Sequence, residues 1–321
     1  MESISRSCCY ALLLVVAVVA VEGSGYEYDE DLSLSYYRES CPQLEQIVHK
    51  KLKLWLKNDS TLAPALINLH YRDCAVRGCD ASILLEHEGS ERTAKASMSL
   101  RGFQVIDDIK SEVEKKCPKT VSCADILASA ARDATGAVGG PFWSVPYGRK
   151  DGRVSLAEEA ESLPKGRERI TELVELFQSK GLNVLDLVVL SGAHSIGRSG
   201  CAAVQHRLFN YKADPSIDPR YLNFLRRKCR WASESVELDA VTPKKLDVQY
   251  YKNLEKKMGL LSTDQMLYSD SRTASIVSAL ASQPEVFHHQ FAASMIKLGN
   301  IIDYSADQDA EIRHKCSCVN A

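Results

Sequence analysis

The chain has 321 residues, which is enough for one large or two medium-sized domains with a substantial core. Its 40 lysines and arginines nearly balance its 42 aspartates and glutamates, so the formal net charge is −2. The net charge therefore gives no sign of a protein that binds nucleic acid or an anionic membrane surface.

The amino terminus has the pattern of a secretory signal peptide. Arg6 precedes an apolar run that ends at Val21, and Glu22, Gly23, Ser24 and Gly25 follow. The run is too short and too close to the start to span a membrane comfortably, so we predict a signal peptide over residues 1–23. An uncleaved anchor is the alternative. We expect a secreted protein in which residues 24–321 form a single domain.

Cysteine usage supports an oxidising compartment. Of eleven cysteines, Cys8 and Cys9 would leave with the signal peptide. The remaining nine suggest up to four disulfides and one odd thiol. There is no C-x-x-C pair, so the spacing does not suggest zinc. Asn58-Asp59-Ser60 is the only glycosylation sequon and suits a surface turn.

Most of the chain has the periodicity of helices, and alternating strand patterns are scarce. Residues 26–40 are polar and acidic and predict a loose arm. Apolar residues recur at helical spacing from Leu44 to Leu56, and Asp59 or Ser60 can cap the next helix. Further helices are predicted at 103–115, 122–138, 167–180, 183–191, 198–211, 218–228, 243–257, 272–282 and 285–301. The fold class is therefore mainly α, without repeats or a dividing linker.

Residues 70–82 combine two cysteines, five residues apart, with oxygen-bearing side chains. Asp73, Asp80 and Ser82 bring hard oxygen atoms to this segment, and backbone carbonyls near Gly78 can add more. Oxygen-rich loops of this kind suit calcium. A solvated acidic turn is the alternative, and this segment alone does not decide between them.

The apolar stretch 186–197 carries one imidazole, that of His194. The small residues 191–193 leave space beside it, so a bulky, flat group could lie against the ring. Histidine is a common metal ligand, and haem iron is often held by one such residue. A satisfied buried histidine is one alternative. A serine hydrolase with a nucleophile elbow at Ser195 is another, but Ala193 stands in place of the first glycine of that motif.

Several motifs occur in the order of one known family. They are Leu69–Ser82, Leu100–Phe103, Val121–Asp125, Leu190–Gly197 and Glu311–Arg313 before Cys316. With these motifs the chain resembles the secretory (class III) plant haem peroxidases from about Cys41 to Cys316. The resemblance implies the haem-peroxidase fold, in which a distal and a proximal helical domain sandwich haem b. It also implies a cell-wall monomer that uses hydrogen peroxide to oxidise small aromatic donors, without a nucleic-acid or membrane partner.

The resemblance assigns roles around the haem. His194 would hold the iron, and Asp264 would accept a hydrogen bond from its other ring nitrogen, which makes the imidazole a stronger donor. A helix cap is the alternative role for Asp264. Ser99 matches a position that holds a haem propionate, and Pro164 matches the proline near the entrance for aromatic donors.

The family pattern further implies two calcium sites and four disulfides. The distal calcium would be bound by Asp73, Asp80, Ser82, the carbonyls of Val76 and Gly78, and Glu91 through water. The proximal calcium would be bound by Ser195, Asp239, Thr242, Asp247 and the carbonyl of Lys245. The disulfides would be Cys41–Cys117, Cys74–Cys79, Cys123–Cys316 and Cys201–Cys229, which leaves Cys318 as the odd thiol.

The distal face departs from the family pattern. The family places an arginine and, four residues later, a histidine above the iron, and Asn68 and Arg72 stand there in this chain. Residues at i and i+4 share a helix face, so we expect both side chains to face the haem. Cleaving hydrogen peroxide needs a base and a cation, and a guanidinium cannot be the base. His70 points to another side of the helix, and Ala96 replaces the asparagine that orients the family's histidine.

Two functions therefore follow from the sequence. The first is a secreted haem peroxidase with weakened peroxide cleavage, in which Arg72, Asn68 and Asp264 occupy the catalytic positions, since losing a base typically costs ~10²–10⁴ in rate. The second is a catalytically degenerate, haem-binding cell-wall protein of the same fold.

Overall fold

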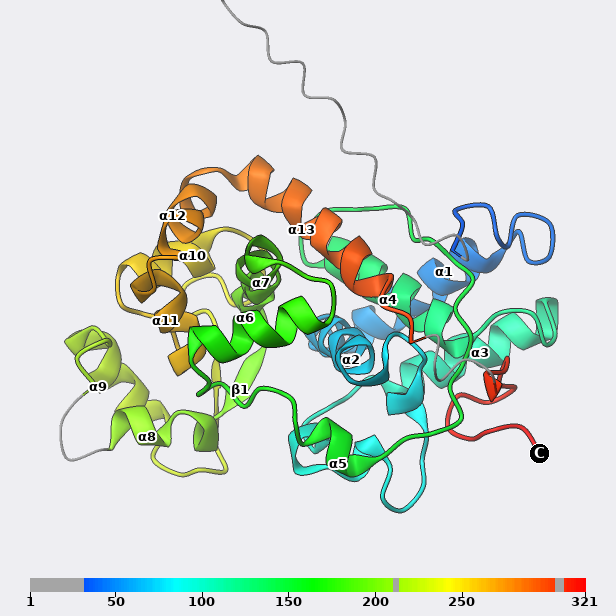
Figure 1. Ribbon diagram of the computed structural model, residues 1–321, viewed down its shortest axis with the longest axis horizontal. Coiled ribbons are helices and arrows are strands. Elements are labelled where there is room, and N and C mark those ends of the chain that lie inside the picture. Colours follow the sequence, from blue (N-terminus) through cyan, green and yellow to red (C-terminus); the bar gives the residue numbers. More distant parts are fainter. Residues whose placement is uncertain (1–31, 210–213, 304–308) are drawn as a thin grey trace, which may run out of the picture.

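The computed structural model describes residues 32–209, 214–303 and 309–321 and is mainly helical, as the sequence predicts (Figure 1). The α-helices are α1 (Leu44–Asn58), α2 (Leu62–Arg77), α3 (Phe103–Lys116), α4 (Cys123–Ala137), α5 (Ala157–Ala160), α6 (Ile170–Ser179), α7 (Val184–Ser191), α8 (Gln205–Leu208), α9 (Pro219–Lys228), α10 (Gln249–Glu255), α11 (Ser262–Ser269), α12 (Ala274–Ser282) and α13 (Pro284–Gly299). The 3₁₀ helices are η1 (Ser82–Leu84), η2 (Glu91–Thr93), η3 (Lys95–Ser97), η4 (Gly192–Ser195) and η5 (Cys201–Ala203). Strands β1 (Arg198–Gly200) and β2 (Ser235–Glu237) pair antiparallel. The predicted signal peptide, with Cys8 and Cys9, lies outside the described residues.

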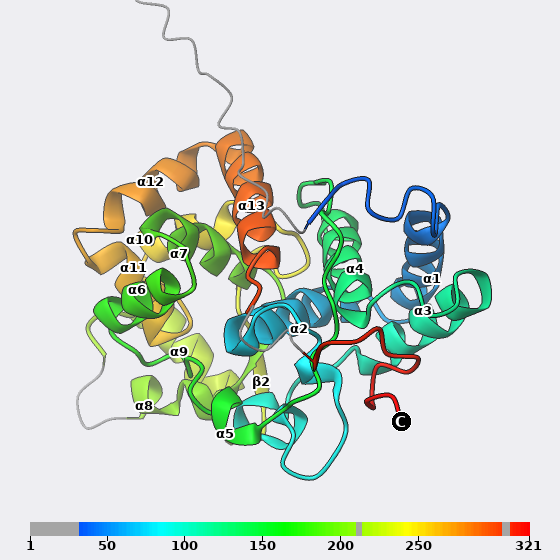
Figure 2. The ribbon, with the colours of Figure 1, turned by 45° about the vertical axis from the view of Figure 1, so that its right-hand side comes forward.

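Helix α2 lies between two groups of helices (Figures 1 and 2). On one side are α1, α3 and α4, and on the other are α6, α7 and α10 to α12. Helix α13 packs against α7 and also reaches α2. The segment that follows α7 approaches the start of α2, since a Cβ atom added at Gly197 would lie 3.2 Å from Pro64. This arrangement agrees with the two helical domains of the predicted fold class.

Residues 32–40, the described part of the predicted loose arm, are held firmly against the rest of the protein. Ser33 forms a β-bridge with Tyr147. The Tyr37 side chain is buried, and its hydroxyl donates a hydrogen bond to Asp125 at 2.8 Å. The prediction of a loose arm is wrong here because two buried side chains, Leu32 and Tyr37, outweigh the polar composition of the segment.

The predicted helix over residues 198–211 is wrong in its first half. Arg198 begins strand β1, and its guanidinium pairs with Glu237 of β2 at 2.7 Å. Cys201 follows directly and forms a disulfide with Cys229. These contacts between distant segments favour extended backbone over the local helical periodicity, and α-helix resumes only at α8.

Other helices also differ from the prediction, and the short helix α5 lies where none was predicted. Of residues 243–257 only Gln249–Glu255 form helix α10, and just before it the Asp247 carboxylate accepts the N–H of Gln249 at 2.8 Å. Helix α11 lies where the periodicity predicts none. Its first turn is capped by Asp264, whose side chain accepts the backbone N–H of Leu261 at 2.8 Å.

Four disulfides tie the chain together. They join Cys41 to Cys117, Cys74 to Cys79, Cys123 to Cys316 and Cys201 to Cys229, the pairs that the family pattern implies. Cys318 is free and exposed. Among the helices of the described residues, none combines the length and the apolar composition that crossing a bilayer requires.

Candidate functional site

The candidate ligand His194 lies on η4, at the end of α7. Helix α7 begins with a capping box, in which Asn183 and Asp186 each accept the other's backbone N–H. At Gly192 any added Cβ would clash with the hydroxyl of Tyr251 and the ring of Phe287. From the sequence, we expected the small residues 191–193 to leave space for a flat group beside His194. At Gly192 that interpretation is wrong, because the chain's own aromatic side chains fill the space.

The His194 ring is fixed by a buried carboxylate. Its Nδ1 lies 2.7 Å from Asp264 Oδ1, and the Asp264 side chain is only 2% exposed, whereas that of His194 is 36% exposed. Because the carboxylate accepts, the ring proton is on Nδ1 and the lone pair is on Nε2. The other oxygen of Asp264 caps α11. Both roles considered for Asp264 are thus present, one on each oxygen atom.

The electrostatics favour a strongly donating imidazole. Exclusion of water lowers the pKa of His194, but the charge of Asp264 and its hydrogen bond outweigh this effect and raise the pKa above its usual value. A carboxylate behind a histidine raises the basicity of that histidine as a metal ligand. The tautomer, the partly exposed ring and this carboxylate fit an iron ligand of the haem type.

The two α2 positions that we expect to face the haem hold an amide, Asn68, and a cation, Arg72. Asn68 is exposed, and Arg72 is half-buried. The Nε and Nη1 atoms of Arg72 are buried without a hydrogen-bond partner, and burial lowers the pKa of Arg72. A guanidinium does not deprotonate in proteins, so it remains a cation with donors to spare. These orphaned donors fit a site for an anion or a developing negative charge.

His70 is not available as a base over this face. It is buried, and its Nδ1 lies 3.7 Å from Cys74 Sγ of the Cys74–Cys79 disulfide. Burial, with a smaller contribution from Arg149, lowers the pKa of His70 to about 3. The residue therefore stays neutral and packs inside the helical group, on a different side of α2 from Arg72.

Two further candidates, Ser99 and Pro164, lie on loops. Ser99 is exposed just after η3, and Pro164 is half-buried. Glu161 connects the two loops, because its Oε1 accepts the backbone N–H of Ala96 at 3.4 Å and its Oε2 pairs with Lys165 at 3.1 Å. The sequence interpretation missed this link, since nothing in the local pattern of a surface glutamate points to a partner 65 residues away.

The expected distal calcium ligands form a buried acidic cluster. Asp73, Ser82 and Glu91 are fully buried, and each has one side-chain oxygen without a hydrogen-bond partner. An unsatisfied buried oxygen typically costs ~1–3 kcal/mol. Burial raises the pKa of Asp80 to about 6 and that of Glu91 to about 8, and it raises the pKa of Asp73 well above its usual value. Unpaired oxygens among crowded carboxylates fit a hard divalent cation.

The backbone carbonyls of this cluster are engaged within the chain. The carbonyl of Gly78 accepts the N–H of Asp80 at 2.9 Å. The carbonyl of Val76, in the last turn of α2, accepts a hydrogen bond from Lys180 Nζ at 2.7 Å. Lysine commonly caps free carbonyls at a helix end. Lys180 follows α6, so a cation from the opposite helical group lies on an expected calcium ligand.

The expected proximal calcium ligands lie around Ser195, the residue that follows His194. Ser195 Oγ donates to the carbonyl of Lys245 at 2.8 Å and accepts the N–H of Asp247 at 3.2 Å. Thr242 Oγ1 donates to Asp247 at 3.1 Å and lies 3.4 Å from Asp239 Oδ2. All five residues that the family pattern names therefore belong to one network of oxygen atoms, which fits calcium.

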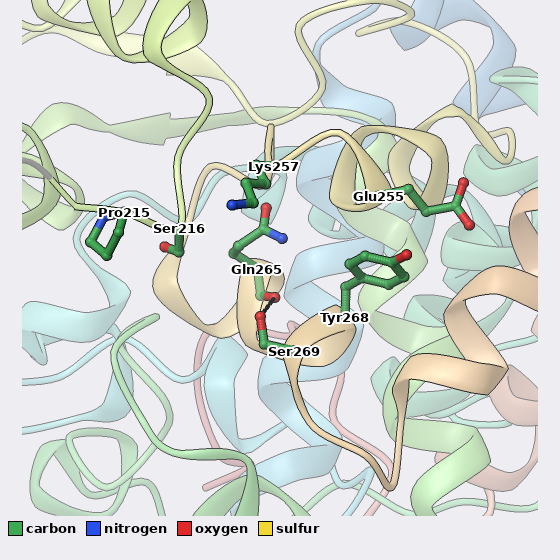
Figure 3. Close-up of a pocket in the computed structure, with 7 residues that line it drawn as sticks. All are labelled: Pro215, Ser216, Glu255, Lys257, Gln265, Tyr268 and Ser269. Carbon is green, nitrogen blue, oxygen red and sulfur yellow. Dashed lines mark hydrogen bonds between the residues drawn. The ribbon is translucent and has the colours of Figure 1, made fainter.

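A pocket of about 440 Å³ lies beside α11, and neither His194 nor Asp264 lines it. Figure 3 shows the residues that do. The walls of the pocket are Pro215, Ser216, Glu255, Lys257, Gln265, Tyr268 and Ser269. Gln265 accepts the N–H of Gly259 at 3.0 Å and donates to the carbonyl of Leu254 at 2.9 Å. Internal hydrogen bonds therefore already occupy the amide group of Gln265.

Comparisons with known proteins agree on one family. A family model described as peroxidase matches residues 48–283. Peroxidase 7 of Arabidopsis thaliana is 55% identical over 302 residues, which cover 92% of this chain and 86% of that protein. Peroxidase 25 of Arabidopsis thaliana is 40% identical, with 97% and 98% covered. Peroxidase N1 of Nicotiana tabacum is also 40% identical, with 99% and 98% covered.

Proposed function

Because this chain belongs to the secretory (class III) plant peroxidases, a family of oxidoreductases that use hydrogen peroxide, we propose that it is a haem peroxidase of aromatic donors with slowed peroxide cleavage. The observation that carries this proposal is the distal helix, where Arg72 presents unpartnered donors and Asn68 is neutral. The cation that stabilises a leaving oxygen is present, and the base that moves the proton is not.

The proposal gives each residue near the haem a role. His194 would hold the iron through Nε2, with Asp264 behind it, and Ser99 would hold a propionate. Haem, when bound, supplies the iron centre at which hydrogen peroxide is reduced and from which donors are oxidised. Arg72 would orient the peroxide and stabilise its developing negative charge. Aromatic donors would enter beside Pro164.

A second function is favoured by the same distal face. Arg72 stands at the base position and His70 is buried against the Cys74–Cys79 disulfide, so the second proposed function is a haem-binding cell-wall protein with negligible turnover. In either case we propose a secreted monomer, with a signal peptide over residues 1–23 and one domain over 24–321. The four disulfides support export to an oxidising compartment.

Stopped-flow mixing of the haem-loaded protein with hydrogen peroxide tests the proposed function. We expect a rate proportional to peroxide concentration, clearly above that of free haem in the same buffer. The rate should show no titration between pH 5 and 8, because no distal histidine is there to ionise. A rate at or below that of free haem would support the catalytically degenerate protein instead.

Calcium should stabilise the protein more at pH 8 than at pH 5. Folding raises the pKa of Asp80 to about 6 and that of Glu91 to about 8, so the folded, calcium-free protein holds these protons more tightly than the unfolded chain. Its stability therefore falls as the pH rises from about 4 to about 8. Calcium binds the deprotonated carboxylates and reverses this loss. Thermal unfolding of calcium-loaded and calcium-depleted protein at both pH values measures the effect, and an equal gain in Tm at pH 5 and pH 8 would contradict it.

Replacing Lys180 by methionine should tighten calcium binding at the distal cluster. The substitution removes a cation from the Val76 carbonyl and keeps the length of the side chain. A hydrogen bond to a charged group is worth ~1.5–3 kcal/mol, so we expect roughly tenfold or more in affinity. Equilibrium dialysis with radioactive calcium measures it. Lys115→Met removes an exposed cation that is paired with Glu112, and as the control it should leave the calcium affinity unchanged.

A further inference from the structure

Asp264 receives three hydrogen bonds, and two of them converge on one oxygen. Its Oδ2 accepts the N–H of Leu261 at 2.8 Å. Its Oδ1 accepts from His194 Nδ1 at 2.7 Å and also from the hydroxyl of Tyr250 at 3.0 Å. Tyr250 is buried on α10, and its ring meets the His194 ring edge to face, with centroids 6.2 Å apart. The histidine therefore shares its acceptor with a phenol.

Tyr250 acts on Asp264 only as a donor. Burial disfavours the charged form of a phenol, so this buried hydroxyl keeps its proton and is the donor in the bond to Asp264. The hydroxyl is closed off from solvent and is directed at Asp264. A hydrogen bond to a carboxylate stabilises its charge and lowers its basicity. The Asp264 carboxylate is therefore a weaker acceptor for the hydrogen bond from His194.

We propose that Tyr250 is a positioning residue that limits how strongly His194 donates electrons. It does so by holding Asp264 in place and by taking part of the accepting capacity of Oδ1. This inference rests on the proposed role of His194 as the ligand of haem iron. Partners behind a metal-bound histidine set both its orientation and its basicity. Tyr250 would therefore weaken the imidazolate character that Asp264 alone would confer.

The neighbouring tyrosine provides a matched control. Tyr251 lies on the same helix and is fully buried, and its hydroxyl donates to the carbonyls of Val188 and Val189 at 3.1 and 3.2 Å. Tyr250→Phe and Tyr251→Phe thus each remove one buried phenolic oxygen and keep the ring. Only the first substitution changes the hydrogen bonding of Asp264.

Resonance Raman spectra of the reduced, haem-loaded protein test the proposal through the iron–histidine stretching band. Tyr250→Phe should shift this band to higher frequency, because His194 regains a stronger acceptor, and should lower the reduction potential of the haem. Tyr251→Phe should leave both unchanged. In an Asp264→Asn background, Tyr250→Phe should add no further shift, since the shared oxygen carries the coupling.

A second variant keeps the test decisive if Tyr250→Phe does not fold. Incorporating 3-fluorotyrosine at position 250 makes the phenol a stronger donor with almost no change in shape, so the band should move to lower frequency. A wild-type histidine band that neither variant moves would overturn the role of Tyr250 and leave the proposed function intact. Absence of an iron–histidine band in the wild type would instead overturn the ligand assignment of His194.

Discussion

Replacing Arg72 by histidine should speed the reaction of the haem-loaded protein with hydrogen peroxide at least tenfold, and adding Asn68→Arg should raise the rate further. The full effect of a missing base is ~10²–10⁴. The first substitution restores a group that can take the proton, and the second places a cation one turn away on the same face of α2. Asn68 is exposed, so a longer side chain fits there.

The two substitutions should be non-additive, since base and cation act on opposite ends of one O–O bond. Asn68→Arg alone should increase the rate of reaction with hydrogen peroxide only slightly, because it adds a second cation and no base. Arg227→His, on the exposed side of α9, changes the same residue types far from α2 and should leave the rate unchanged. The double variant should still be slower than relatives with an orienting asparagine, because Ala96 has no amide to hold the new imidazole. A wild-type rate equal to that of the double variant would refute the distal assignment.

Replacing His194 by alanine should yield a folded protein without stably bound haem. The substitution removes the only proposed bond from the chain to the iron, whereas Asp264 keeps its bonds from Tyr250 and Leu261. Circular dichroism should therefore show the helices retained, while absorption in the haem region is lost. Added imidazole should restore binding by filling the space that the side chain leaves.

His206→Ala is the control for this experiment. His206 also bonds to α11, with its Nε2 2.9 Å from Ser262 Oγ, but it does not contact Asp264 through a hydrogen bond. The variant should keep its haem spectrum. An unchanged, imidazole-type spectrum in His194→Ala would show that another residue holds the iron.

The two sets of expected calcium ligands and the histidine–aspartate pair follow from the family resemblance, and in the structure the residues of each set lie together. Asp264 is instructive. From the sequence it is either a helix cap or a partner of the histidine, and the structure gives it both roles because a carboxylate has two oxygens. A sequence pattern assigns a role to a whole residue, so it cannot predict that the two oxygens of one carboxylate accept hydrogen bonds from different partners.

Other features depend on contacts that local periodicity does not record. Residues 198–204 have helical spacing, but an ion pair to Glu237 and a disulfide to Cys229 hold part of them extended. Tyr250 carries no motif that marks it as a partner of Asp264. Lys180 reaches the Val76 carbonyl across 104 residues. Such roles follow from tertiary packing, which overrides local propensity.

The disulfide pattern makes the polypeptide a pair of closed covalent rings. Cys41–Cys117 closes a span of 76 residues, and Cys123–Cys316 closes a span of 193. The connector between the rings is residues 118–122, of which Val121 and Ser122 are buried. A protease that cuts one exposed loop inside either ring therefore releases no fragment, and the nicked molecule stays in one piece until a reductant opens the ring. A single cut of this kind would leave the mobility of the protein on non-reducing gels almost unchanged, and separate fragments would be visible only on reducing gels.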